Sequence, residues 1–134
     1  MSSMTAVYGG PMEVICKHEA SGATITTVAQ PKEGPETGFS PTDLCAASLG
    51  MCAMTLMALM GERHNIDLTG LKIEIDKTMR SDPSAIGQIK IVFHMPEREY
   101  SEKDKARLER AINICPIHHT LAPEVEQIFE ILWP

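Results

Sequence analysis

Two of the four cysteines in this chain, Cys52 and Cys115, lie in settings that suit thiol redox chemistry. Cys52 lies within a long uncharged run, and Cys115 directly precedes Pro116, a residue that suits the first position of a short helix. The N–H groups exposed at a helix start favour a thiolate. Attack of a thiolate on a peroxide oxygen gives a sulfenic acid, which condenses with a second thiol to a disulfide. Cys52 and Cys115 are therefore candidates for a redox dithiol, although their spacing does not establish that they meet.

The remaining cysteines have less distinctive surroundings. Cys16 suits a core position, because free cysteine is among the most buried residue types. Cys45 and Cys52 are about two helical turns apart and share one helix face. Cys45 therefore suits either a second resolving thiol or a packed core, and the core is the favoured interpretation.

A metal site is a further interpretation of the second cysteine and the histidines after it. Cys115, His118 and His119 carry the ligand atoms that zinc prefers. A structural zinc site takes four ligands, however, and the chain contains no Cys-x-x-Cys pair. We expect no metal and no cofactor, with the two histidines in a polar turn.

Residues 40–61 predict one long helix around which the rest of the chain is organised. Ser40 suits the N-cap, Asp43 places negative charge in the first turn, and Gly61 suits the left-handed conformation that ends a helix. No charged residue lies between Asp43 and Glu62. A helix that is apolar all round is buried on every side, so we expect a central helix.

Alternating apolar and polar residues predict an α+β fold around this helix. We expect residues 1–11 to be frayed and residues 1–134 to form a single domain. The expected elements are a hairpin of strands 12–18 and 23–29, a second hairpin of strands 71–79 and 89–95, a helix from Ser101, a short helix from Pro116, and a last strand over 125–133.

Composition and charge exclude several classes of partner. The chain has 134 residues, a net charge of -6 and no basic run, which argues against nucleic-acid binding. The uncharged run approaches the ~20 residues of a membrane span, but small and polar residues dilute it, so we expect no membrane partner. The N-terminal residues lack a charged leader and an apolar signal core, and we expect a cytoplasmic protein.

Two motifs resemble the OsmC/Ohr family, whose members handle organic hydroperoxides. The first begins with Pro41-Thr42-Asp43-Leu44 and continues through small residues to Cys52; the second is Cys115-Pro116-Ile117 followed by Thr120-Leu121. The order of the expected elements is also similar to that family over roughly residues 12–133.

The resemblance implies antiparallel sheets wrapped around long central helices in an intertwined homodimer. It implies that Cys52 is the peroxidatic nucleophile and Cys115 the resolving thiol. The substrate would be an organic or fatty-acid hydroperoxide in an apolar pocket lined by residues such as Leu49, Met51 and Met54. A dithiol such as a lipoylated protein would reduce the disulfide.

The chain departs from the pattern of the well-defined peroxidases of this family. Those proteins pair the nucleophile with an arginine from the N-terminal β region and a glutamate early in the central helix. Here no arginine precedes Arg63, and Thr42 and Asp43 occupy the helix start. The chain therefore resembles the broader OsmC-like group. The alternative function is a non-enzymatic dimer that binds a small apolar ligand in the same pocket.

Overall fold

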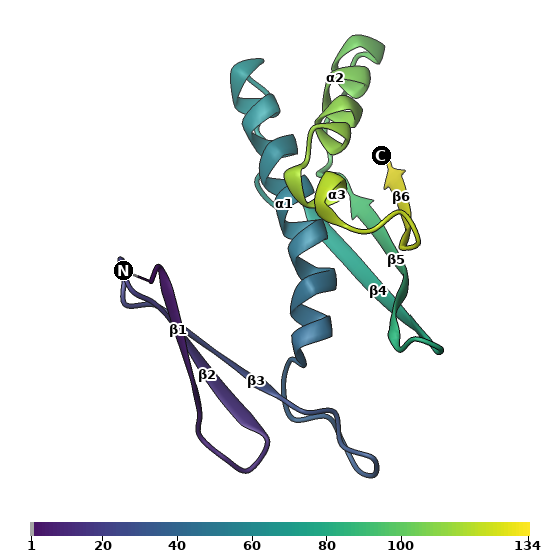
Figure 1. Ribbon diagram of the computed structural model, residues 1–134. Helices are drawn as coiled ribbons and strands as arrows, with labels where there is room; N and C mark the ends of the chain where they lie inside the picture. The colour runs from purple at the N-terminus through teal and green to yellow at the C-terminus, as the bar shows by residue number, and fades with distance from the viewer. Residues whose placement is uncertain (1) are drawn as a thin grey trace. The chain divides into compact units, whose positions relative to one another are not determined.

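A computed structural model describes residues 2–134, and the chain divides into two compact units between Cys45 and Ala46. The first unit contains an antiparallel sheet of three strands in the order β1-β2-β3 (Figure 1). Its strands are β1 (Met4–Tyr8), β2 (Glu13–His18) and β3 (Thr24–Val28). The pairing of β2 with β3, which runs from Glu13 opposite Val28 to Lys17 opposite Thr24, confirms the first predicted hairpin.

The expectation that the N-terminal residues are frayed is wrong for β1. This strand pairs with β2 along its full length, from Met4 opposite His18 to Tyr8 opposite Val14. The reason is the backbone of β2, which would otherwise have an unpaired edge on that side. All five residues of β1 are exposed, so the strand is held by backbone pairing more than by burial of its side chains.

Helix α1 (Pro41–Arg63) begins with a reciprocal capping arrangement. The hydroxyl of Ser40 accepts a hydrogen bond from the backbone N–H of Asp43 at 3.1 Å. The carboxylate of Asp43 accepts one from the backbone N–H of Ser40 at 3.0 Å. Both ends of this capping box are thus satisfied, with aspartate in the place that glutamate usually takes.

The end of α1 differs from the prediction that Gly61 terminates it in a left-handed conformation. The helix continues to Arg63, and the left-handed residue is Asn65, with a φ of 57°. Gly61 serves a different purpose, because the chain folds back so that the N–H of Ile66 donates to the Gly61 carbonyl at 2.7 Å. A Cβ atom at position 61 would lie 2.6 Å from the Ile66 carbonyl oxygen, so the turn requires glycine.

Only one face of α1 is buried, which corrects the expectation of burial on every side. The other side exposes large apolar side chains, including Met51 at 53% and Leu59 at 48% of their surface. By length and composition α1 is the one helix within residues 2–134 that could cross a membrane, although a core helix passes the same test. The buried residues of α1 are spaced by three and four, as one helix face requires: Ala46, Leu49, Gly50, Ala53, Met57 and Gly61.

The second unit is built on the sheet β4-β5-β6. Strand β4 (Lys72–Arg80) pairs antiparallel with β5 (Ala85–His94), which confirms the second predicted hairpin. Strand β6 (Glu126–Leu132) lies on the other side of β5 and runs parallel to it. The sheet is therefore mixed rather than purely antiparallel, because a parallel neighbour needs a long crossover and the chain between β5 and β6 supplies one.

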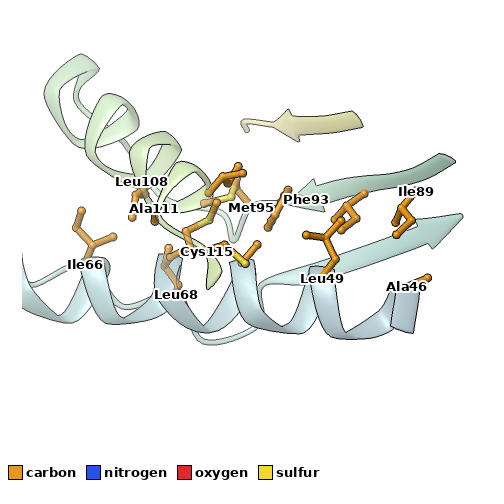
Figure 2. Packing of buried hydrophobic residues seen from close by; sticks show 14 of the residues in the cluster. Ala46, Leu49, Ile66, Leu68, Ile89, Phe93, Met95, Leu108, Ala111 and Cys115 are labelled. Atoms are coloured by element: carbon orange, nitrogen blue, oxygen red, sulfur yellow. The ribbon is translucent and has the colours of Figure 1, made fainter. Parts of the chain in front are cut away.

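That crossover carries helices α2 (Glu102–Asn113) and α3 (Pro116–Thr120). Together with α1 and the sheet they enclose the core of the second unit (Figure 2). Leu49 and Met57 of α1, Ile89, Ile91 and Phe93 of β5, and Leu108 of α2 have no exposed surface. Cys115, between α2 and α3, belongs to the same cluster and is equally buried.

Candidate functional site

The structure brings Cys52 and Cys115 into contact. Both lie in the second unit, Cys52 on α1 and Cys115 as the N-cap residue of α3. The neighbouring Cys52 thiol is one of the causes that raise the pKa of Cys115. Neither thiol is in a disulfide.

Burial distinguishes the two thiols. Cys115 has no exposed surface, whereas part of the Cys52 surface is exposed. Figure 2 shows Cys115 inside the apolar cluster, above α1. Burial is the largest cause of the raised pKa of Cys115, because apolar surroundings disfavour the charged thiolate. A molecule arriving from solvent therefore meets Cys52 and not Cys115.

The backbone N–H groups of Ile117 and His118, in the first turn of α3, lower the pKa of Cys115 in part. Pro116 at the first helical position suits this turn, since proline has no N–H to satisfy. Among the described residues, no cationic side chain contributes to the shift. A negative charge on Cys115 is thus supported by backbone dipoles.

The two histidines of α3 face separate acceptors. The Nδ1 atom of His118 lies 2.5 Å from Oε1 of Gln127 on β6. The Nε2 atom of His119 lies 2.7 Å from the backbone carbonyl of Asn113. Within residues 2–134 no three side chains of the ligand-bearing types are grouped as a metal site would need. The interpretation that joined Cys115 with both histidines at one metal ion therefore gains no support from this geometry.

The other predicted site residues are dispersed. Cys45 is exposed, and Cys16 lies half-buried on β2 of the first unit. Leu49 is fully buried in the core and cannot line an open pocket. Met51 is exposed and Met54 half-buried, so these two remain available for an apolar ligand.

Sequence reasoning did not identify Gln127. Its side chain donates a hydrogen bond to the His118 backbone carbonyl at 3.0 Å, in addition to the contact with the His118 ring. The only signal in the sequence is the position of Gln127 within the last predicted strand. No motif connects it with Cys115, because the parallel pairing that brings β6 beside α3 is not visible in local residue patterns.

Chemically, this arrangement is a dithiol in which one sulfur is accessible and the other is buried behind it. Two neighbouring thiols can close to a disulfide where their geometry suits it. The accessible sulfur can react first with an oxidant, and the buried sulfur is already placed to attack the product.

Comparison with known proteins gives a consistent assignment. The sequence model of a family described as OsmC-like protein matches residues 34–128. A candidate osmotic stress induced and detoxification response protein from Psychrobacter arcticus has a TM-score of 0.90 and is 28% identical, with 98% of this chain and 96% of that chain covered. None of the curated proteins compared with the chain matches it.

Two more distant structures show the same fold. An organic hydroperoxide resistance protein OsmC from Legionella pneumophila has a TM-score of 0.73 and is 14% identical, with 97% of this chain and 95% of that chain covered. The organic hydroperoxide resistance protein OhrB of Bacillus subtilis has a TM-score of 0.69 and is 19% identical, with 96% of each chain covered.

Proposed function

Because the chain belongs to the OsmC-like protein family, we propose that it reduces organic hydroperoxides with Cys52 and Cys115. The observation that carries the proposal is the proximity of the buried Cys115 thiol to the partly exposed Cys52 thiol. It pairs an accessible nucleophile with a second thiol close by. The names of the Legionella and Bacillus proteins, which refer to organic hydroperoxide resistance, suggest the same class of substrate.

The reaction has two steps. The Cys52 thiolate attacks the terminal peroxide oxygen of ROOH, the O–O bond breaks, and the departing alkoxide takes a proton to leave as ROH. The Cys115 thiolate then attacks the sulfur of the Cys52 sulfenic acid. The S–S bond forms, the S–O bond breaks, and hydroxide takes a proton and leaves as water. Two electrons pass from the two thiols to the peroxide.

The assignment of roles follows from burial. Cys115 is enclosed in the apolar cluster, where burial raises its pKa, whereas Cys52 is partly exposed and can meet the peroxide first. Arg63, on the same helix, lies about 16 Å along the axis from Cys52 and is too distant to act.

The disulfide must be reduced before a second turnover. A partner dithiol, such as the lipoyl group of a lipoylated protein, would attack one sulfur, release the two cysteines in turn and become oxidised itself. We further propose that the single domain works in the cytoplasm as a homodimer. The exposed Met51 and Leu59 of α1 support a dimer, since apolar side chains on one helix face suit contact with a second copy.

The test is a thiol map before and after one equivalent of cumene hydroperoxide under non-reducing conditions. We expect a Cys52–Cys115 disulfide within seconds, and none in Cys52→Ser. In Cys115→Ser, Cys52 should stop at the sulfenic acid and react with dimedone. The matched controls, Cys45→Ser and Cys16→Ser, should form the disulfide at the parent rate.

Survival of both thiols in excess peroxide would refute the enzymatic proposal. The alternative, a non-enzymatic dimer that binds a small apolar ligand near Met51 and Met54, would then be tested with a fluorescent fatty acid. Sedimentation at micromolar concentration tests the homodimer separately, with Met51→Glu as the variant expected to dissociate it.

A further inference from the structure

The two thiols of the candidate site differ in their access from solvent. Cys115 has no exposed surface and belongs to the buried apolar cluster of the second unit. Cys52 is partly exposed and packs against that cluster from α1. A disulfide between these residues would therefore join one sulfur that solvent can reach to one that is enclosed.

The enclosure of Cys115 is built into the fold on several sides. Leu108 of α2 and Phe93 of β5 belong to the same cluster and also have no exposed surface. The Cys115 N–H donates to the Ile112 carbonyl at 3.3 Å, and the Cys115 carbonyl accepts from the His119 N–H at 3.3 Å. Backbone hydrogen bonds thus hold Cys115 at the junction of α2 and α3. A molecule from solvent reaches its sulfur only if this junction opens.

Cys52 lies instead at the border between the buried and the exposed faces of α1. Leu49, one turn before it, is fully buried, whereas Thr55, one turn after it, is exposed. Met51, the residue before Cys52, exposes 53% of its surface. The Cys52 sulfur is therefore covered on the side of the cluster and open on the other.

The chemistry of disulfide reduction makes this difference decisive. An attacking thiolate approaches a disulfide along the line of the S–S bond, from the side opposite the sulfur that leaves, and the rate depends on access to the attacked sulfur. Attack on Cys52 therefore comes from outside the cluster, because Cys115 lies within it. Attack on Cys115 would require the thiolate to approach through the packed interior.

We propose that Cys52 is also the sulfur at which the disulfide is reduced: the partner dithiol forms its mixed disulfide with Cys52, and Cys115 is the group that leaves. One sulfur then receives the oxidant and the reductant in turn. This inference rests on the proposed dithiol function and deepens it, because it assigns the point at which the reductant enters.

The reduction proceeds in two exchanges. A thiolate of the partner dithiol attacks the Cys52 sulfur, the new S–S bond forms, and the bond between Cys52 and Cys115 breaks. Cys115 takes the electron pair and a proton. The second thiol of the partner then attacks the partner's own sulfur in the mixed disulfide, which closes the partner's disulfide and releases Cys52. Two electrons pass from the partner to the cysteines, and the partner's two thiols supply the two protons.

The experiment uses a monothiol, which cannot carry out the second exchange and so leaves the mixed disulfide in place. In full-length Cys16→Ser/Cys45→Ser, the disulfide between Cys52 and Cys115 is formed with diamide. The protein is then mixed with 2-mercaptoethanol and quenched with acid at intervals from milliseconds to seconds. Free thiols are alkylated with N-ethylmaleimide at low pH, and peptide mapping locates the adduct.

At the earliest times we expect 2-mercaptoethanol on Cys52 and N-ethylmaleimide on Cys115, in at least about tenfold excess over the reverse arrangement. A second measurement compares access directly: Cys115→Ala and Cys52→Ala, each added to the same background, react with DTNB. The chain that retains Cys52 should react at least about 100-fold faster than the chain that retains Cys115, since a buried thiol reacts only through local opening. In guanidinium chloride, the matched control, this difference should disappear.

A mixed disulfide located mainly on Cys115, or equally on both cysteines, would overturn the inference. Equal DTNB rates in the folded variants would overturn it as well, and so would failure of diamide to join the two cysteines. The proposed function is tested separately. If peroxide leaves the parent unoxidised, that function fails, while the diamide experiment still identifies the attacked sulfur. If peroxide oxidises the parent and the adduct lies on Cys115, only the present inference fails.

Discussion

Gly50 of α1 and Ile73 of β4 pack so closely that a Cβ atom at position 50 would lie 2.8 Å from the Ile73 Cδ1 atom. The same atom would lie 3.1 Å from Cδ1 of Ile75. The helix can approach the sheet to this distance only because residue 50 has no side chain. Cys52 lies half a turn further along α1, so this contact also sets the height of its thiol above the sheet.

Gly50→Ala should therefore destabilise the protein, by about 1 kcal/mol. Overpacking against Ile73 and Ile75 costs about 2 kcal/mol, and the higher helix propensity of alanine offsets about 1 kcal/mol of this. Urea denaturation checks the value. Adding Ile73→Val, which removes the clashing methyl group, should make the double variant more stable than the sum of the single effects by about 1 kcal/mol. Strict additivity would contradict the contact.

Gly61→Ala should cost more than Gly50→Ala, about 2 kcal/mol. At position 61 the opposing atom is the backbone oxygen of Ile66, which cannot move aside as the tip of a side chain can. The turn after α1 would have to open, and the hydrogen bond from Ile66 N–H to the Gly61 carbonyl would be lost. Thermal unfolding of the two variants measures the two losses of stability. A loss for Gly61→Ala that is equal to or smaller than that for Gly50→Ala would show that the turn can open to accommodate a side chain.

Ser40→Ala should destabilise the protein by about 1.5 kcal/mol, and Ser101→Ala by about 0.5 kcal/mol. Ser40 is buried and belongs to a two-way capping box with Asp43. Ser101 is exposed and accepts from the Asp104 N–H at 3.0 Å, while the Asp104 carboxylate accepts from Arg107 instead. Denaturant midpoints of the two variants measure the difference, and a larger loss for Ser101→Ala would contradict this ranking.

Stability under reducing conditions should decline as the pH rises above about 8.5, the usual pKa of a thiol. The folded protein raises the pKa of Cys115, chiefly through burial, so above that pH the unfolded chain loses the Cys115 proton while the folded chain keeps it. The contribution is complete below the unfolded pKa and is lost as the pH rises through the folded value.

The measurement is urea denaturation in the presence of a phosphine reductant at pH 7, 8.5 and 10. The decline with pH should be smaller in Cys115→Ala, whatever the absolute stability of that variant. Cys45→Ala is the matched control and should decline as the parent does. An identical decline in all three proteins would place the titrating group elsewhere.

Local patterns in the sequence were sufficient for most elements of the fold. The alternation in 71–79 and 89–95 gave the second hairpin, and Ser101 with Asp104 gave the start of α2. Such features depend on residues a few positions apart, and there the periodicity of apolar residues and the capping groups is decisive.

Features that depend on contacts between distant residues could not be predicted from local residue patterns. Strand β1 is exposed along its length and shows no buried face, so nothing in its own residues distinguishes it from a frayed end. Gly61 reads as a helix terminator, but its position is required by the carbonyl of Ile66.

The same distinction applies to the candidate site. Cys52 and Cys115 could be singled out by their local settings and by resemblance to a family, whereas their proximity depends on how α1 and the start of α3 pack in one core.

That parallel pairing also has a consequence for how the protein matures. Strand β6 can join β5 only after the crossover with α2 and α3 has passed over the sheet, and contacts between such distant segments form late in folding. Cys115 lies within this crossover, so its approach to Cys52 requires the crossover to be packed against α1. A disulfide between these two thiols would therefore report that this packing has been reached.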